Sequence, residues 1–189
     1  MKALVTGGTG FIGKNLVEKL IEEGHEVVAT SSGSGNDLPK KVKVKYHSLF
    51  GIDLKDFQPD VVFHLAANND TLCQDEEEML RTNLHDPSVL FQNLANKGCK
   101  KFVYASSTAV YGNEASPYIE GQTPEKPLNI YGKSKKMFDD WAMEFARDKT
   151  LQVVGFRYCN VYGPGEGHKG RRMSMIGQML RKVMQEKPI

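Results

Sequence analysis

A glycine-rich turn follows the first predicted strand of this chain and leads directly into its first predicted helix. Residues 2–6 form a short apolar run, and residues 6–13 read Thr-Gly-Gly-Thr-Gly-Phe-Ile-Gly. Gly7, Gly10 and Gly13 allow a tight turn, close approach of the backbone to a bound group, and close packing of helix on strand. The helix N-terminus offers backbone N–H groups and a partial positive charge. In this strand–turn–helix context, the pattern predicts a site for the pyrophosphate of a dinucleotide rather than an ordinary tight turn.

Apolar runs alternate with helical patterns along the rest of the chain. Strands that alternate with helices predict a parallel sheet with right-handed crossovers, which is the α/β doubly wound parallel sheet of the Rossmann fold. The expected strands are residues 2–6, 26–30, 42–46, 60–65, 101–105 and 151–156, the expected helices are residues 11–23, 76–97, 131–147 and 171–185, and residues 31–37 are a polar loop.

Length and composition limit the class of protein. The 189 residues suit one α/β domain with part of a second, and 25 basic against 23 acidic residues leave a net charge of +2, so no nucleic-acid or membrane surface is indicated. The three scattered cysteines form no CxxC pattern, so we expect no metal site and reduced thiols in a cytoplasmic protein. His64 ends a predicted buried strand and is expected to be a packed core residue. We also expect no signal peptide and no transmembrane run.

A tyrosine and a lysine stand four residues apart in a predicted helix. Tyr131 and Lys135 share one helix face, with Cβ atoms about 5–6 Å apart. A nearby cation favours the phenolate, so the pair can make a usable base from a phenol whose free pKa is about 10. Ser107 follows a predicted strand and lies between this pair and the glycine-rich turn in the sequence. Together these features predict a hydride-transfer site.

The end of the second predicted strand carries no acid. A carboxylate there usually bonds the ribose hydroxyls of NAD, whereas this chain reads Thr30-Ser31-Ser32. An acid would repel a 2′-phosphate and small hydroxyls would not, and Lys40 and Lys41 downstream could pair with such a phosphate. The residues therefore favour NADP; the alternative is an exposed loop that binds NAD less tightly.

Six stretches, in order and spacing, resemble the extended short-chain dehydrogenase/reductase family of nucleotide-sugar epimerases and dehydratases over nearly the whole chain. Within that family, residues 125–135 and 155–170 are most similar to the NADP-dependent ADP-glyceromanno-heptose 6-epimerases, and they fit the UDP-galactose 4-epimerases less well. The six stretches are residues 6–13, residues 64–67 (His-Leu-Ala-Ala), Asn83, residues 106–112 (Ser-Ser-Thr-Ala-Val-Tyr-Gly), residues 131–135 (Tyr-Gly-Lys-Ser-Lys) and residues 157–164 (Arg-Tyr-Cys-Asn-Val-Tyr-Gly-Pro).

The resemblance implies a role for each matching residue. Tyr131 would be the general acid/base at the sugar carbinol, with Ser107 bonded to the reacting oxygen. Lys135 would hold the nicotinamide ribose and lower the pKa of Tyr131. Lys169 would be a second base on the opposite face of the sugar, although a solvated charge is an equal alternative. The other implied contacts are Gly7, Gly10, Phe11 and Ile12 at the pyrophosphate, Ser31, Ala66 and Ala67 beside the cofactor, Asn160 near the substrate phosphates, and His168 as a structural residue or substrate contact.

These roles imply a nucleotide-sugar epimerase that oxidises a sugar carbinol transiently with tightly bound NADP and returns the hydride to the other face. The sugar would be of the ADP-heptose type or, as the alternative, of the UDP-glucose/galactose type. A dehydratase would usually have an Asp-Glu pair after Ser107, and Thr108-Ala109 stands there instead. A nucleotide-binding module without activity is the other alternative, because fold does not determine function.

The resemblance also sets an expectation for the domains. Residues 1–165 would form the dinucleotide-binding domain and residues 166–189 the start of the substrate-binding region, with most of the family's C-terminal substrate domain missing. Such a chain would bind NADP and turn over sugar poorly or not at all. Exposed apolar surface would favour a homo-oligomer.

Overall fold

The computed structural model describes residues 1–31, 38–40, 42–46, 57–147 and 150–185 of the chain. The chain forms two compact units, Met1–Arg157 and Tyr158–Ile189, and each is described by itself. This division falls between residues 157 and 158, whereas the sequence analysis expects a domain boundary after residue 165.

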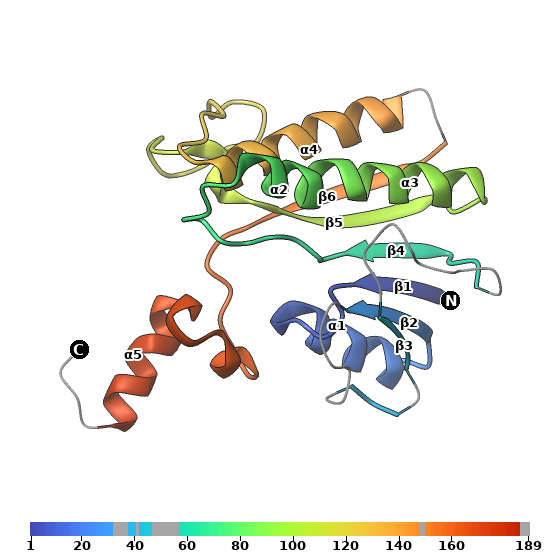
Figure 1. Ribbon diagram of the computed structural model, residues 1–189, viewed down its shortest axis with the longest axis horizontal. Coiled ribbons are helices and arrows are strands. Elements are labelled where there is room, and N and C mark those ends of the chain that lie inside the picture. The colour runs from blue at the N-terminus through green and yellow to red at the C-terminus, as the bar shows by residue number, and fades with distance from the viewer. Residues whose placement is uncertain (32–37, 41, 47–56, 148–149, 186–189) are drawn as a thin grey trace. The chain divides into compact units, whose positions relative to one another are not determined.

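One six-stranded sheet forms the centre of the first unit (Figure 1). Its strand order is β3-β2-β1-β4-β5-β6, and every pairing from β3 to β5 is parallel. The chain starts in the middle, builds outward to β3, and then returns to β4 and builds in the other direction. This is the order of a doubly wound sheet, so the predicted fold class is confirmed, and the order reverses between β1 and β4. The strands are β1 (Lys2–Thr6), β2 (Glu26–Ser31), β3 (Lys43–Tyr46), β4 (Val61–His64), β5 (Lys101–Ser107) and β6 (Gln152–Tyr158).

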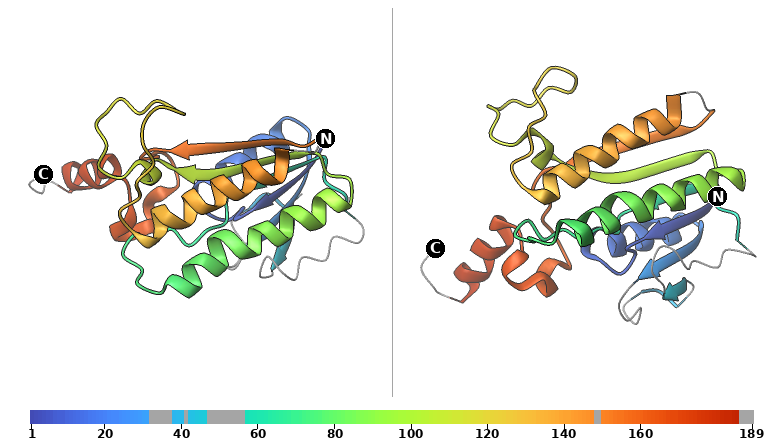
Figure 2. Two further views of the ribbon diagram at one scale, coloured as in Figure 1. Left: turned by 90° about the horizontal axis from the view of Figure 1, so that it is seen from above. Right: turned by 45° about the horizontal axis from the view of Figure 1, so that its top comes forward.

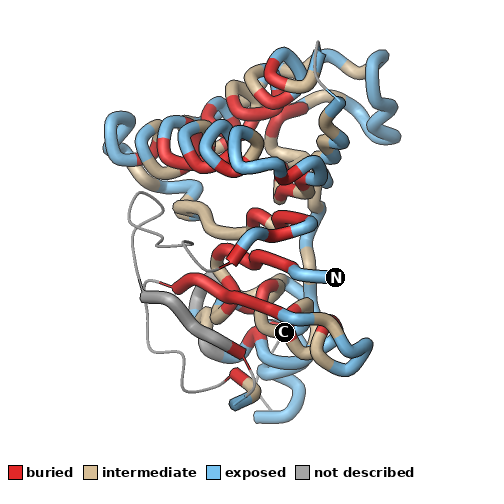
Figure 3. The backbone as a smooth tube through the Cα atoms, turned by 90° about the vertical axis from the view of Figure 1, so that its right-hand side faces the viewer, coloured by how far each residue is buried: buried red, intermediate tan, exposed pale blue. Residues whose placement is uncertain are grey.

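Helices cover both faces of the sheet. Because successive side chains of a strand point to opposite faces, Leu4 packs in one apolar core with Phe91 and Phe138, whereas Val5 packs in the other with Val17. Figure 2 shows α3 and α4 side by side along the sheet, and Figure 3 shows that buried residues concentrate in the strands and on the inner sides of these helices. The helices of the first unit are α1 (Phe11–Glu22), α2 (Glu76–Leu80), α3 (Asp86–Asn96) and α4 (Ile130–Arg147), and α5 (Met175–Met184) belongs to the second unit.

The helix predicted over residues 76–97 contains a turn of different geometry. Arg81–His85 form a π-helical turn, η2, between α2 and α3. Asp75 begins the helix by accepting a hydrogen bond from the backbone N–H of Glu78 at 2.9 Å. The stop signal at its end is confirmed, because α3 ends at Asn96 and Gly98 has a φ of 96°. π turns inside helices often occur at functional sites.

The second unit contains a 3-10 segment, η4 (Glu166–Arg172), followed by α5. The prediction of a helix from residue 171 is therefore wrong at its start. Gly170 has a φ of 56°, which interrupts the helical geometry of the backbone. Ser174 then caps α5, because its side chain accepts a hydrogen bond from the backbone N–H of Gly177 at 2.9 Å. One side of α5 exposes large apolar side chains, namely Met175, Ile176, Met179, Leu180, Val183 and Met184.

Candidate active site

The glycine-rich turn between β1 and α1 adopts a conformation that requires glycine at two positions. Gly7 has a φ of 67°, and a Cβ atom there would lie 2.8 Å from the backbone nitrogen of Ala66. A Cβ atom at Gly13 would lie 2.1 Å from the carbonyl oxygen of Gly7. Only glycine tolerates both the positive φ and such approaches. The turn therefore packs tightly between α1 and the loop that follows β4, the loop that carries Ala66 and Ala67.

The N-terminus of α1 has the features of a phosphate site. Gly10 is its N-cap and provides no side-chain hydrogen bond, and the first turn contains no acidic residue. Phe11 is buried and Ile12 half-buried at the first two helical positions. The helix dipole and backbone N–H groups at such an end favour an anion. The sequence predicts that these residues hold a pyrophosphate, and their role stays a prediction.

Buried polar groups join the carboxyl ends of β1 and β4. The Thr6 hydroxyl hydrogen-bonds His64 Nδ1 at 2.7 Å and accepts from the backbone N–H of Ala66 at 3.3 Å. His64 also packs edge-on against Phe91, with ring centroids 5.8 Å apart. Burial, with a smaller contribution from the charge of Lys135, lowers the pKa of His64 to about 3. His64 is thus a neutral core residue, as predicted.

The end of β2 carries hydroxyl groups at the position where an acidic side chain usually hydrogen-bonds the ribose of NAD. The buried Ser31 hydroxyl hydrogen-bonds the hydroxyl of Thr9, which belongs to the glycine-rich turn. Lys40 is exposed, and Lys41 lies outside the described residues. The structure therefore places Ser31 beside the predicted phosphate turn.

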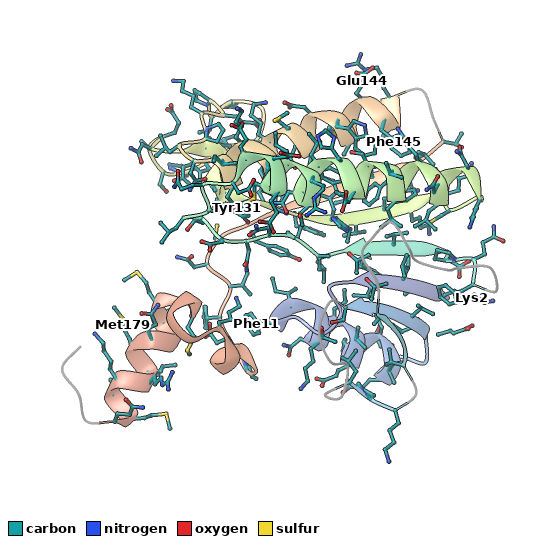
Figure 4. All side chains as sticks on the ribbon, in the orientation of Figure 1. Lys2, Phe11, Tyr131, Glu144, Phe145 and Met179 are labelled. Carbon is teal, nitrogen blue, oxygen red and sulfur yellow. The ribbon has the colours of Figure 1, made fainter. Side chains whose placement is uncertain are left out.

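Tyr131, Ser107 and Lys135 meet at the end of β5. Tyr131 lies in the first turn of α4 (Figure 4), and its phenol shares a hydrogen bond with the Ser107 side chain. Lys135 Nζ lies 5.9 Å from the centroid of the Tyr131 ring and donates to the carbonyl oxygen of Ala105 at 2.8 Å. Ser107 Oγ also accepts from the backbone N–H of Ala109 at 3.1 Å. The three residues predicted to act together are therefore neighbours.

The ionisation of this group differs from the sequence-based expectation. Burial raises the pKa of Tyr131, and the hydrogen bond with Ser107 opposes this only in part. Burial lowers the pKa of Lys135 to about 8, and the charge of Asp139 opposes the shift. The expected lowering of the Tyr131 pKa is therefore wrong for this chain without ligand. At neutral pH the phenol keeps its proton, which suits it to donate one.

Asn83 is a buried residue to which the sequence analysis assigns no role. It lies in the π turn, and its amide exchanges hydrogen bonds with the backbone of Asn68, at 2.8 Å and 2.9 Å. The same amide donates to Ser134 Oγ at 3.0 Å, and Ser134 donates to the carbonyl oxygen of Tyr131 at 2.7 Å. Asn83 thus ties the loop after β4 to the first turn of α4.

The sequence analysis also missed a set of polar residues that is hydrogen-bonded to Ser106, the residue before Ser107. Ser106 Oγ donates to Asp139 Oδ2 at 2.9 Å, and Arg157 Nε donates to the same oxygen at 3.2 Å. Arg157 also donates to the Tyr111 hydroxyl at 2.7 Å and pairs with Glu125. The one available sequence signal is that Asp139 stands four residues after Lys135, on the same helix face.

The remaining predicted residues belong to the second unit. Asn160 is exposed after β6, and Lys169 is half-buried in η4. The pKa of Glu166 is lowered chiefly by the hydrogen bond from the Ser174 backbone, with a smaller contribution from the charge of Lys169. The His168 backbone lies in the same segment. Their roles stay predictions.

The described residues contain neither a candidate metal centre nor a candidate membrane span. Within the described ranges, no group of three or more His, Cys, Asp or Glu side chains could hold a metal ion. None of the helices in the same ranges has both the length and the apolar character needed to cross a membrane.

The fold and the clustered Ser107, Tyr131 and Lys135 define a Rossmann-type α/β protein with a short-chain dehydrogenase/reductase-like site. A model of the NAD-dependent epimerase/dehydratase family matches residues 3–189. The chain therefore belongs to this family.

Solved structures of sugar-nucleotide enzymes have the same fold. ADP-L-glycero-D-manno-heptose-6-epimerase of Helicobacter pylori is 31% identical over 97% of this chain, with a TM-score of 0.85. UDP-glucose 4-epimerase of Thermotoga maritima, solved with UDP-glucose, is 28% identical over 100% of this chain, with a TM-score of 0.89. MoeE5, solved with UDP-glucuronic acid and NAD, is 30% identical over 100% of this chain, with a TM-score of 0.85. The chain spans 63%, 65% and 63% of the length of these three proteins.

Proposed function

We propose that this chain is a nucleotide-sugar epimerase that acts by transient oxidation of a sugar carbinol with tightly bound NADP. The observation that carries the proposal is the cluster of Tyr131, Ser107 and Lys135 at the carboxyl edge of the sheet. The cluster lies in the same unit as the glycine-rich turn. A dinucleotide in a doubly wound sheet binds across this edge, where the strand order reverses.

The residues present fit a nicotinamide dinucleotide. Gly7, Gly10, Phe11 and Ile12 would hold its pyrophosphate, because the turn brings backbone close to the ligand and no first-turn acid repels it. Lys135 would hold the nicotinamide ribose, and the loop with Ala66 and Ala67 would line the site. When bound, the cofactor supplies a hydride acceptor that becomes a hydride donor.

The proton is handled by the protein. Tyr131 would take the carbinol hydroxyl proton in its phenolate form as the carbonyl forms, and would return it as the carbonyl is reduced. Burial raises the pKa of the Tyr131 phenol, so formation of the phenolate depends on a neighbouring positive charge. Ser107 donates a hydrogen bond to the reacting oxygen and so orients it. The phenolate that accepts the proton needs a cation close by, and Lys135 supplies that charge. Lys169, from the second unit, would exchange a proton on the opposite face of the sugar, which inversion of a stereocentre requires.

Two features of the chain support NADP over NAD. Ser31 ends β2 without a negative charge, and its hydroxyl is bonded to the glycine-rich turn. The 2′-phosphate of NADP would meet no carboxylate from β2, and Lys40 is an exposed cation in the chain segment that follows.

An ADP-heptose is the substrate class that we favour, because the H. pylori enzyme that acts on one is 31% identical to this chain. A UDP-glucose or UDP-galactose type sugar is the second candidate, since the T. maritima UDP-glucose 4-epimerase has a TM-score of 0.89. Asn160 would lie near the substrate phosphates, and His168 would contact substrate or support the loop. Binding of nucleotide without turnover is the third outcome.

The proposal includes a cytoplasmic location and self-association. The three cysteines, Cys73, Cys99 and Cys159, are free thiols, which is usual in a reducing compartment. The exposed apolar side of α5 is a surface that association of two copies would cover. Sedimentation velocity over a range of concentrations measures the oligomeric state directly.

The decisive experiment separates cofactor binding from turnover. Dissociation constants for NADPH and NADH are measured by nicotinamide fluorescence, and ADP-heptoses and UDP-hexoses are then incubated with the protein and NADP while NMR follows each epimer. We expect tighter binding of NADPH and only slow interconversion of one sugar class. Substitution of Tyr131 with Phe should abolish interconversion and leave NADPH binding within a few-fold. Absence of NADPH binding would contradict the proposal, whereas binding without interconversion of any sugar would support the binding module.

A further inference from the structure

Helix α4 is bonded to the end of β5 through side chains on one face. Lys135 Nζ donates to the carbonyl oxygen of Ala105 at 2.8 Å, and Asp139 Oδ2 accepts from Ser106 Oγ at 2.9 Å. Ser107, which shares a hydrogen bond with the phenol, follows directly. Since Lys135 and Asp139 are one helical turn apart, the second contact helps to determine where the first turn of α4 lies on the strand.

The Asp139 carboxylate is itself held from a second strand. Its side chain is buried, and its Oδ2 atom also accepts from Arg157 Nε of β6 at 3.2 Å. Arg157 is anchored in turn by the Tyr111 hydroxyl at 2.7 Å and by an ion pair with Glu125 at 2.5 Å. Ser106 and the Arg157 guanidinium therefore both bind Oδ2 of Asp139.

Asp139 is also the anion one turn from the buried cation of the site. Burial disfavours the charged form of Lys135 and so lowers its pKa. The negative charge of Asp139 favours the charged form and acts in the opposite direction. The imidazole of His64 is not a second cation beside Asp139, because burial keeps it neutral. The titratable and charged groups that face the pair are Tyr131 on α4, His64 on β4, Tyr104 on β5 and Arg157 on β6.

We propose that Asp139 is a positioning residue that seats α4 on the end of β5 and supplies the negative charge that keeps Lys135 a cation beside Tyr131. The importance of this arrangement for catalysis rests on the function proposed above. The arrangement itself is a property of the ligand-free chain, so it can be tested without cofactor or sugar.

The test follows the ammonium group of Lys135 by NMR in protein that carries isotope-labelled lysine. The resonance is assigned by its loss in the Lys135→Arg variant, and its midpoint is measured by pH titration. Asp139→Asn preserves the shape and removes the charge, and it should lower the midpoint by about one pH unit. Asp140→Asn is the matched control, because Asp140 is the adjacent, exposed carboxylate and pairs with Lys136 at 2.8 Å.

An unchanged midpoint in Asp139→Asn, or an equal shift in Asp140→Asn, would overturn the proposal. If Asp139→Asn does not fold, the wild-type protein provides the measurement: the Asp139 carboxyl carbon should show an inflection at the Lys135 midpoint, and its absence would refute the coupling. NADPH binding is measured in parallel. We expect at least tenfold weaker binding in Asp139→Asn and no change in Asp140→Asn. If the wild type itself does not bind NADPH, the proposed function fails while the lysine titration still decides the role of Asp139.

Discussion

The stability of the protein should rise with pH because Lys135 is buried as a cation. Burial lowers its pKa from 10.5 to about 8. Between these values the unfolded chain binds the lysine proton and the folded chain has released it, so the free energy of unfolding rises with pH across this window. One pKa unit corresponds to about 1.4 kcal/mol, so the full displacement is worth about 3 kcal/mol. About 2 kcal/mol of this should appear between about pH 7 and pH 9.5.

Lys135→Met removes the titrating group, and the difference between wild type and variant isolates its contribution. Tyr131 and Cys99 also titrate at alkaline pH. Burial raises the pKa of both, so each makes the fold less stable as pH rises through its unfolded-state pKa. The Cys99 contribution is common to the two proteins and cancels in the difference. The Tyr131 contribution falls above the window of about pH 7 to pH 9.5, because the pKa of an unfolded tyrosine is about 10. Thermal or urea unfolding at half-unit steps of pH measures the difference, and about 2 kcal/mol corresponds to roughly 4–8 °C in Tm for a chain of this size.

The matched control is Lys133→Met on the same helix, where the lysine side chain is 56% exposed and pairs with Glu76. Its stability curve should run parallel to that of the wild type. The reasoning would be refuted if the Lys135→Met curve were parallel as well, because the folded protein would then hold the lysine proton as strongly as the unfolded chain does. The reasoning would also be refuted if the free energy of unfolding of the wild type fell with pH relative to that of Lys135→Met.

Three further predictions concern the core, the cofactor and the reaction. Gly155→Ala would place a Cβ atom 2.4 Å from the ring of buried Tyr104, so thermal unfolding should show a free energy of unfolding that is lower by about 2 kcal/mol. The control is Gly167→Ala, where a Cβ atom would have nothing within 4 Å, and its stability should stay within about 0.5 kcal/mol of the wild type. Ser31→Asp should weaken NADPH binding at least tenfold and spare NADH, and an equal loss for both would indicate damage to the turn. Tyr131→Phe should reduce epimerisation by about a hundredfold or more, measured by NMR at saturating substrate.

The parts of the site that follow from local spacing could be predicted from the sequence. The glycine-rich turn depends on which residues tolerate a positive φ and close backbone approach, and Gly7 and Gly13 meet both demands in the structure. The pairing of Tyr131 with Lys135 depends only on helical periodicity. The alternation of strands and helices likewise predicts a doubly wound parallel sheet, because right-handed crossovers leave few arrangements.

The parts that depend on burial could not be predicted. A lysine four residues from a tyrosine suggests a lowered phenol pKa, but the packing of the first turn of α4 raises it instead. The π turn that directs Asn83 toward Asn68 has no signal in a helical pattern, and neither does the contact of Asp139 with Ser106 and Arg157. These contacts join residues distant in sequence, so one sequence contains no periodicity that reports them.

The residues proposed for the redox step and those proposed to contact the sugar belong to different units. Every residue proposed for cofactor binding, and the cluster of Ser107, Tyr131 and Lys135, lies in the first unit, whereas Asn160, His168 and Lys169 lie in the second. If the second unit selects the sugar, the substrate can change without any change in the redox residues. Two solved relatives differ in the sugar nucleotide that their names specify, an ADP-heptose in one and UDP-glucose in the other, and have TM-scores of 0.85 and 0.89 to this chain. The proposal thus assigns the redox step to residues of the first unit and the contacts with the sugar to residues of the second.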